Sequence, residues 1–229
     1  MKQKNNHRVN PHLTFPKRLL YKILHTFYSL LYHQLAWTYD WIASIVSLGA
    51  WQSWVQSVLP YLNGWKILEL GFGPGHLQVT LHQKEISVFG LDESSQMAKI
   101  AYHRINELGK YPFLVRGKAQ TLPFLDECFQ QVVMTFPSGF IFNSQTIYEI
   151  HRVLVIGGEA VILPFVWMTG RKPLERAFAW LYRITGETPE WDEKSLDPLK
   201  KMGFDVSWKV NEYASSKILL ILLKKNSNL

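Results

Sequence analysis

The chain has 229 residues, of which 47% are hydrophobic and 19% are charged, so it can form a globular core and is not a disordered chain. Its formal net charge is +7 at pH 7. A single cysteine, Cys128, excludes an internal disulfide and a multi-cysteine zinc site. The histidines and carboxylates show no metal-ligand spacing, so we expect no metal.

The basic charge is concentrated at the N-terminus. Residues 1–39 contain six lysines and arginines and no acidic residue, which leaves +1 for the rest. Residues 1–15 predict a disordered basic tail, and Lys17–His33 predicts an amphipathic helix with basic first turns. This helix suits a membrane interface, so we expect peripheral membrane association; docking of the helix on its own domain is the alternative. No signal peptide is evident, which favours a cytoplasmic protein, at the inner face of the membrane if the helix binds lipid.

Two further helices are expected near Tyr39–Leu48 and Trp51–Leu59. Residues 41–65 carry no charge, but serine, glutamine, glycine and Pro60 interrupt them. We therefore favour buried or interfacial helices over a membrane span. The expected domains are the tail at 1–15, an N-terminal helical lid at 16–62 and the main domain at 63–229.

The segment Lys66–Gly75 is the most informative part of the chain. A short apolar run containing Glu69 ends in three glycines at alternate positions, which let backbone N–H groups approach a ligand. A helix can open at His76, facing the same ligand. The third glycine of a dinucleotide-binding loop is missing, and so is the Gly-Lys-Ser/Thr of a phosphate-binding Walker loop. The next strand ends in Asp92, at about the spacing of a ribose-binding acid.

Strands and helices alternate through the rest of the chain, which predicts a parallel sheet with helices on both faces. The expected strands are Lys66–Leu70, Ser87–Asp92, Phe113–Arg116, Gln131–Thr135, Glu159–Pro164, Asp205–Val210 and Lys217–Leu223. The expected helices are Leu77–Gln83, Ser95–Leu108, Ser144–Val155, Pro173–Ile184 and Leu196–Met202.

Four ordered motifs resemble the class I S-adenosylmethionine (SAM)-dependent methyltransferases. The glycine loop is similar to E/D-x-G-x-G-x-G, and residues 91–97 are similar to the family's D-x-S-x-x-M. Residues 117–124 resemble G-D-A-E-x-L-P-F, and residues 148–158 resemble a run ending in E-x-x-R-V-L-K-P-G-G. The resemblance implies an α/β, Rossmann-like, doubly wound sheet of seven strands, mostly parallel with the last strand antiparallel. It also implies SAM as cofactor and S-adenosylhomocysteine as product.

The resemblance further implies the cofactor site. In it, Asp92 holds the ribose, Met97, Ala119 and Gln120 flank the adenine, and Glu69 orders the loop. Lys118 stands where the family has an acid that accepts from the adenine amino group, and a lysine has only donors. The implied cofactor-binding residues are Glu69, Gly71, Phe72, Gly73, Gly75, Asp92, Glu93, Met97, Lys118, Ala119, Gln120, Thr135 and Phe136.

The stretch 39–54 is similar to the N-terminal Y-D-x-x-x-x-x-x-S-x-G-x-x-x-x-W of the ubiquinone/menaquinone-biosynthesis methyltransferases. This implies a small acceptor, apolar or lipid-linked, with Thr135 and Phe136 on the methyl-transfer side. No residue is diagnostic of a general base. The candidate acceptor-side polar groups, each with a structural role as its alternative, are His33, Tyr39, His76 and His151.

Two other functions remain open. A nucleic-acid methyltransferase acting on RNA would use the basic tail for phosphate contacts, but basic residues elsewhere are balanced by acids, so no nucleic acid is expected. A non-catalytic SAM-binding scaffold would account for Lys118. The sequence gives no prediction of the oligomeric state.

Overall fold

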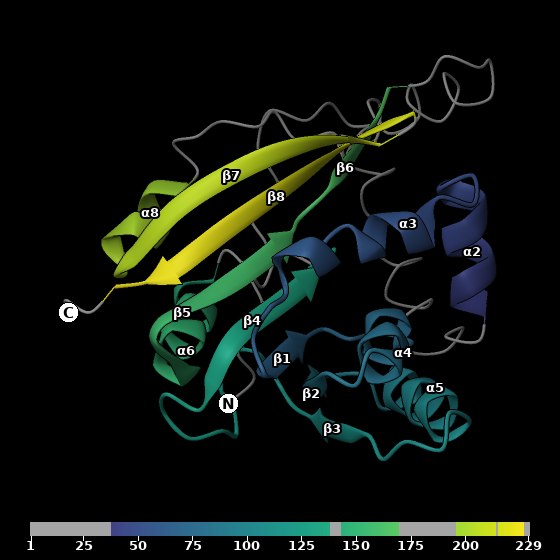
Figure 1. Cartoon of the computed structure of the whole chain (residues 1–229), viewed down its shortest axis with the longest axis horizontal. Helices are drawn as coiled ribbons and strands as arrows, with labels where there is room; N and C mark the ends of the chain where they lie inside the picture. Colours follow the sequence, from purple (N-terminus) through teal and green to yellow (C-terminus); the bar gives the residue numbers. More distant parts are fainter. Residues whose placement is uncertain (1–37, 138–142, 170–195, 214, 227–229) are drawn as a thin grey trace, which may run out of the picture.

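The computed structural model of the chain describes residues 38–137, 143–169, 196–213 and 215–226. These residues form one twisted sheet with helices on both of its faces (Figure 1). Five parallel strands lie in the order β3-β2-β1-β4-β5. In chain order the strands are β1 (Lys66–Leu70), β2 (Ser87–Asp92), β3 (Phe113–Arg116), β4 (Phe129–Thr135), β5 (Leu154–Leu163), β6 (Val166–Met168), β7 (Phe204–Tyr213) and β8 (Ser216–Lys225).

The last strand runs against all the others. β8 is antiparallel to β5, β6 and β7, so these three share the direction of the parallel strands. The predicted Rossmann-like sheet, mostly parallel with an antiparallel last strand, is confirmed. The predicted number of seven strands is wrong, because the described residues form eight. Pro164 has no N–H to give to a strand ladder, so β5 ends before it and β6 resumes the pairing with β8 two residues later.

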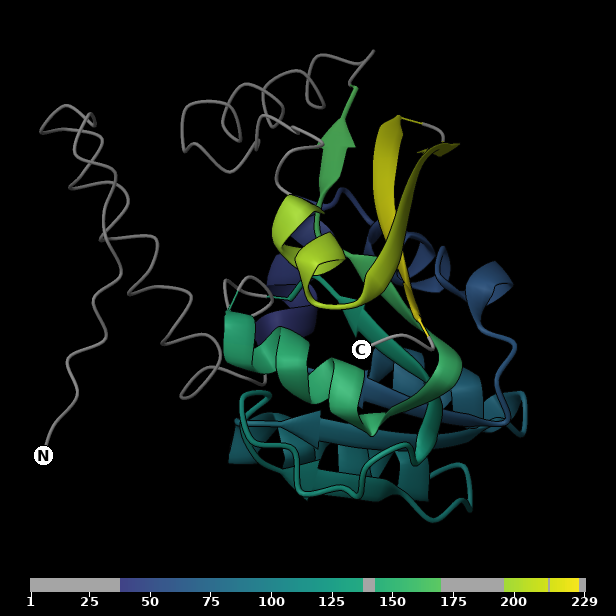
Figure 2. The same ribbon diagram turned by 90° about the vertical axis from the view of Figure 1, so that its left-hand side faces the viewer.

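The helices cover the two faces of the sheet in separate groups. Figure 2 shows α6 and α8 together on the face turned towards the viewer, and Figure 1 shows α4 beside α5. In chain order the helices are α2 (Tyr39–Val46), α3 (Trp51–Gln56), the 3-10 turn η2 (Leu59–Tyr61), α4 (His76–Gln83), α5 (Ser95–Asn106), α6 (Ser144–Val153) and α8 (Asp197–Lys201). The predicted helices Lys17–His33 and Pro173–Ile184 lie outside the described residues.

Each face has its own hydrophobic core, because successive side chains of a strand point to opposite faces. Ile67 packs in the core beneath α3 and α4, whereas its neighbour Leu68 packs in the core beneath α6 and α8. Val133 and Val132 divide between the two cores in the same way. All four side chains are fully buried. This double burial explains why the central strands are continuous apolar runs in the sequence.

The boundary between α6 and β5 differs from the prediction. The expected helix ran to Val155, but α6 ends at Val153 and β5 starts at Leu154, five residues before the expected start of that strand. The two glycines at 157 and 158 form an irregularity inside the strand rather than a turn. A Cβ on Gly158 would lie 2.9 Å from the carbonyl oxygens of Gln130 and Val155, so only glycine allows this close backbone approach.

The uncharged stretch 41–65 folds as two short helices and a 3-10 turn ahead of β1. α3 is shorter than expected and ends at Gln56, and η2 then carries Pro60 near its start. Among the described residues, no helix has the length and apolar character needed to cross a membrane.

Candidate functional site

The glycine loop connects β1 to α4 at the edge of the sheet where the parallel strands end. Gly71, Gly73 and Gly75 have φ angles of 73°, 52° and 85°, in the left-handed region that favours glycine. Gly71 N donates to Leu91 O at 2.7 Å, which ties the loop to β2. A Cβ on Gly75 would lie 2.7 Å from the Cβ of Ala101, because α5 passes close behind the loop. The loop therefore depends on glycine for its backbone conformation and for its packing.

Glu69 is a carboxyl group enclosed by protein at the end of β1. Its side chain is 1% exposed, and its Oε2 accepts a hydrogen bond from Gln78 Nε2 at 2.8 Å. Burial, against the opposing effect of the Gln78 hydrogen bond and with a smaller contribution from the nearby charge of Asp92, raises the pKa of Glu69 to about 8. The Oε1 atom of Gln78 is buried and has no hydrogen-bond partner among the described residues. These buried polar atoms come from the two elements that flank the glycine loop, β1 and α4.

Asp92 holds the loop and the next helix in register. It ends β2, is 3% exposed, and its Oδ2 accepts from Gly73 N at 2.9 Å. Its Oδ1 accepts from Ser94 N at 2.8 Å, and the Ser94 hydroxyl in turn caps α5 by accepting from Met97 N at 3.3 Å. The structure thus places the carboxylates of Glu69 and Asp92 at the ends of two adjacent strands, as expected for parallel pairing.

The predicted adenine-side residues follow β2 and β3. Met97 is fully buried in the first turn of α5, and Ala119 is 8% exposed in the loop after β3. Lys118 is exposed, and its Nζ lies 3.6 Å from Glu93 Oε1. This surface pair accounts for Lys118 in the described structure, since it places the ammonium group against the residue that follows Asp92.

The loop after β3 is anchored by α6. Glu149 Oε2 accepts from Leu122 N at 2.6 Å, and Arg152 donates to the carbonyl oxygens of Leu122 and Phe124. Arg152 also pairs with Glu149 and Asp126, and its hydrogen bond to Glu149 lowers the pKa of that carboxyl group. The glutamate and arginine of the run at 148–158 therefore have a structural role, which is to fix the loop after β3.

Aromatic side chains line the carboxyl end of β4. The ring of Phe136 stacks on Trp51 at 4.5 Å and 22°, and Tyr39 contacts the edge of Trp51 at 5.9 Å. Trp54 packs against the rings of Trp51 and Phe136, and its Nε1 donates to Ser216 Oγ at 3.1 Å. Phe136 has a φ of 49°, which is strained for a non-glycine residue and is found mostly where function or packing imposes it. We call Tyr39, Trp51, Trp54 and Phe136 the aromatic wall.

The structure separates the three candidate acceptor-side groups that lie within the described residues. Tyr39 belongs to the aromatic wall, and His76 lies at the start of α4 with its Nε2 2.9 Å from Asp40 Oδ1. His151 does not join them: its ring packs on Phe204, and burial lowers its pKa. His33 lies outside the described residues.

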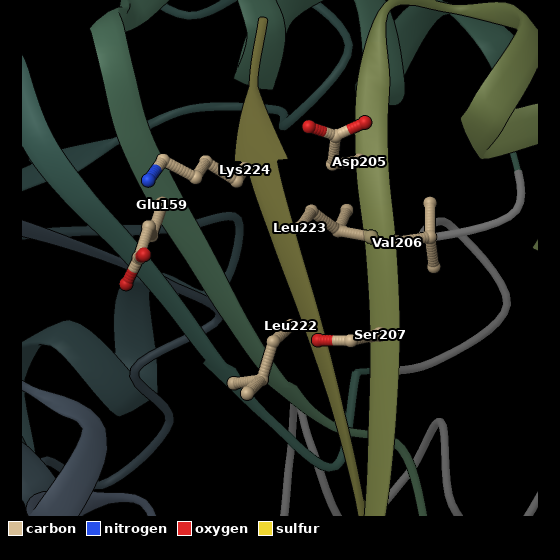
Figure 3. A pocket seen from close by; sticks show the side chains of 7 residues that line it. All are labelled: Glu159, Asp205, Val206, Ser207, Leu222, Leu223 and Lys224. Atoms are coloured by element: carbon tan, nitrogen blue, oxygen red, sulfur yellow. The ribbon is translucent and has the colours of Figure 1, made fainter.

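Two surface hollows lie elsewhere. One, of about 220 Å³, is lined by residues of β5, β7 and β8, including Glu159, Asp205 and Lys224 (Figure 3). Another, of about 410 Å³, contains His151 and Lys225. Both lie away from the carboxyl ends of β1 and β2, so the glycine loop remains the candidate site. No cluster of three or more potential metal ligands occurs in the described part of the chain.

Several residues of the site were not predicted as such. Gln78 is polar and fully buried at the third position of α4, but a single glutamine in a helix gives no signal of its own. The stretch at 39–54 contains three more of them, Asp40, Trp51 and Trp54. Asp40 and Trp54 matched the motif in that stretch, but no role was assigned to either. Arg104, which binds Asp40, could not be found from sequence, because 64 residues separate the two.

Comparison with known proteins identifies the relatives of this chain. The model of the ubiE/COQ5 methyltransferase family matches residues 25–187. A ubiquinone/menaquinone biosynthesis C-methyltransferase UbiE from Blochmanniella floridana is 30% identical over 146 residues, covering 60% of this chain and 58% of the relative. A demethylmenaquinone methyltransferase from Thermotoga maritima is 32% identical over 139 residues, covering 58% and 59%. The matches thus span about three fifths of the length of these curated relatives.

Solved structures share the fold. A SAM-dependent methyltransferase from Methanococcus maripaludis, described as putative, superposes with a TM-score of 0.58 at 20% identity, covering 85% of this chain and 93% of that protein. A geranyl diphosphate methyltransferase in complex with SAM gives a TM-score of 0.59 at 15% identity, covering 76% and 85%. At sequence identities of 20% and 15%, these similarities show a shared fold and nothing more. These comparisons give no support to a nucleic-acid methyltransferase or to a non-catalytic scaffold.

Proposed function

This chain belongs to the ubiE/COQ5 methyltransferase family, and from that premise we propose that it transfers a methyl group from SAM to a small, apolar acceptor of the quinone type. One observation carries the proposal. The glycine loop, with the buried carboxyl groups of Glu69 and Asp92, lies at the carboxyl ends of β1 and β2, and the aromatic wall lies at the end of the adjacent strand β4, so that a cofactor side and an acceptor side adjoin.

The residues around the loop fit SAM. The positive-φ glycines leave backbone N–H groups uncovered by any Cβ, and Asp92 is a carboxylate of the kind that accepts hydrogen bonds from ribose hydroxyls. Glu69 is buried, and its hydrogen bond from Gln78 comes from a neutral amide, so a cationic ligand would favour its ionised form. The unpartnered Oε1 of Gln78 adds a buried acceptor beside Glu69. Met97, Ala119 and Gln120, with Lys118 and Glu93 outside them, are the proposed adenine-side residues.

SAM supplies an electrophilic methyl group, and the chain supplies position and electrostatics. Asp92 and the loop backbone fix the cofactor, while Thr135 and Phe136 face the reacting side from the end of β4. The aromatic wall excludes water and offers flat apolar surfaces to a ring-shaped acceptor. The names of the relatives from Blochmanniella and Thermotoga mention ubiquinone, menaquinone and demethylmenaquinone, which favours a quinone-type acceptor.

Features of the N-terminal part support peripheral membrane association as a further proposal. Trp41 and Ile45 lie one turn apart on α2 and are 73% and 60% exposed, and Leu48, just after the helix, is 36% exposed. The segment before α2 carries six basic residues and no acid, so it suits anionic lipid headgroups. A lipid-linked quinone acceptor would be reached from such a surface.

The decisive experiment is titration calorimetry with SAM and S-adenosylhomocysteine, followed by methyl transfer from labelled SAM to demethylmenaquinol. We expect micromolar binding by the wild-type chain, its loss in Asp92→Ala, and no change in Asp197→Ala, which alters an exposed aspartate on α8. Wild-type protein that binds neither compound would contradict the proposal. Binding without turnover on any quinol would leave the scaffold function as the better account.

A further inference from the structure

Arg104 connects three elements that are far apart in the sequence. It lies on α5, and its Nη1 donates to Pro74 O in the glycine loop at 3.0 Å. Its Nη2 donates to Asp40 Oδ2 on α2. One guanidinium thus bridges the glycine loop and the N-terminal helix, in a geometry that a planar fork of donors can satisfy and a lysine cannot.

His76 completes the cluster at the start of α4. Its Nε2 lies 2.9 Å from Asp40 Oδ1 and 3.5 Å from Arg104 Nη1. The hydrogen bond from His76 and the positive charge of Arg104 keep the pKa of Asp40 below its usual value, so the aspartate is ionised at neutral pH. The side chains of Arg104 and His76 are 27% and 26% exposed, so their interactions with Asp40 are only partly screened by solvent.

The residue next to Asp40 connects to the other side of the site. Tyr39 contacts Trp51, and Trp51 stacks on Phe136 at the end of β4. Of two successive residues of α2, Tyr39 therefore contacts the aromatic wall, and Asp40 is linked to the glycine loop through Arg104. Tyr39 and Asp40 lie in the same turn of α2, so any shift of α2 relative to the loop must also move the aromatic wall.

We propose that Arg104 is a positioning residue, which holds α2 against the glycine loop through Asp40 and so couples the cofactor side of the site to its aromatic wall. The nature of the two ligands rests on the proposed function, whereas the mechanical coupling rests on the contacts alone. Arg104 acts through the backbone of the loop, at Pro74 O.

The test is a double-mutant cycle with Asp40→Asn and Arg104→Met, measured by S-adenosylhomocysteine affinity. Each single variant should raise Kd by about three- to tenfold, and the double variant should raise it no further than the single variants do, as expected for two groups acting as one unit. The matched control replaces the exposed pair Lys217 and Glu212, 3.1 Å apart on β8 and β7, by Met and Gln, and should leave Kd unchanged.

Amide hydrogen exchange on the ligand-free protein supplies a second measurement. Asp40→Asn should speed exchange in residues 72–79 as well as in 39–47, with the β7–β8 hairpin unaffected. A merely structural contact would loosen α2 alone or the whole fold. Additive effects on Kd, or exchange confined to α2, would overturn the coupling while leaving the proposed function intact. If the wild type binds no S-adenosylhomocysteine, the proposed function fails, and hydrogen exchange alone decides whether the coupling exists.

Discussion

At the scale of single residues, Glu69 is the group whose environment departs most from water. It has no cationic partner in the described structure and receives one amide hydrogen bond, so its neutral form is favoured in the folded protein. This makes the folded state bind a proton that the unfolded state releases near pH 4.5.

The stability of the ligand-free protein should therefore depend on pH through Glu69. The contribution of the neutral carboxyl is fully present below about pH 4.5 and is lost as pH rises through about 8, with a slope of up to about 1.4 kcal/mol per pH unit. Glu69→Gln should remove this slope and gain stability relative to wild type above pH 8. Urea unfolding of both proteins at pH 5, 7 and 9 measures this pH dependence of the free energy of unfolding. Glu85→Gln, at an exposed site, is the control, and parallel profiles for wild type and Glu69→Gln would refute the account.

The residue at 75 should tolerate no side chain. Gly75→Ala places a Cβ 2.7 Å from that of Ala101 at a φ of +85°, whereas Gly109→Ala has a φ of +68° and open space. The control variant should cost about 1–2 kcal/mol from the backbone alone. Gly75→Ala should cost a further 1–3 kcal/mol or so from overpacking, and should also abolish SAM binding. Equal losses of stability in the two variants, measured by thermal or urea unfolding, would contradict the close contact between loop and α5.

At the scale of elements, α2 and α3 have two different attachments to the sheet domain. Stacked aromatic rings hold them at the end of β4, and the cluster of Asp40, His76 and Arg104 holds them at the glycine loop. The first attachment is apolar and faces the acceptor side, while the second is ionic and faces the cofactor side. Variants at the two attachments should therefore have different effects on acceptor KM and on cofactor affinity.

Removing the central ring of the aromatic wall should impair acceptor use more than cofactor binding. Trp51→Ala deletes the stack on Phe136, a contact worth about 1 kcal/mol beyond its buried area. We expect the KM for demethylmenaquinol to rise by about tenfold and the Kd for S-adenosylhomocysteine to stay within about twofold. Trp65→Ala removes a ring that is 70% exposed and serves as control. A loss of cofactor affinity as large as the rise in KM would assign Trp51 to the cofactor side instead.

At the scale of the whole molecule, positive charge gathers at the N-terminal end of the chain. All six basic residues that precede α2 lie within residues 1–22, and the remaining chain is nearly neutral. Deleting residues 1–22 should abolish binding to vesicles containing anionic lipid, since each basic residue near the surface contributes about 1 kcal/mol. Co-sedimentation measures this, with neutral phosphatidylcholine vesicles and high salt as controls. Unchanged co-sedimentation of the truncated chain would sink the membrane proposal.

The sequence alone determined much of the local structure. The first three strands begin and end where they were predicted, because double burial makes them continuous apolar runs and the glycine loop and turns bound them. Glu69, the glycines and Asp92 were identified because their spacing is fixed by the strand–loop–helix unit itself. The boundary between α6 and β5 was misplaced, since the glycine pair that usually marks a turn here permits a close approach of β4.

Only the tertiary structure decided how distant segments meet. Asp40, His76 and Arg104 lie 28 to 64 residues apart along the chain, and only the packing of α2, α4 and α5 unites them. The stacking of Trp51 on Phe136, the location of His151 beside Phe204, and the division of one strand by Pro164 likewise depend on pairing and packing. Spacing along a chain fixes contacts within one turn, strand or loop, whereas contacts between elements depend on how the whole sheet is assembled.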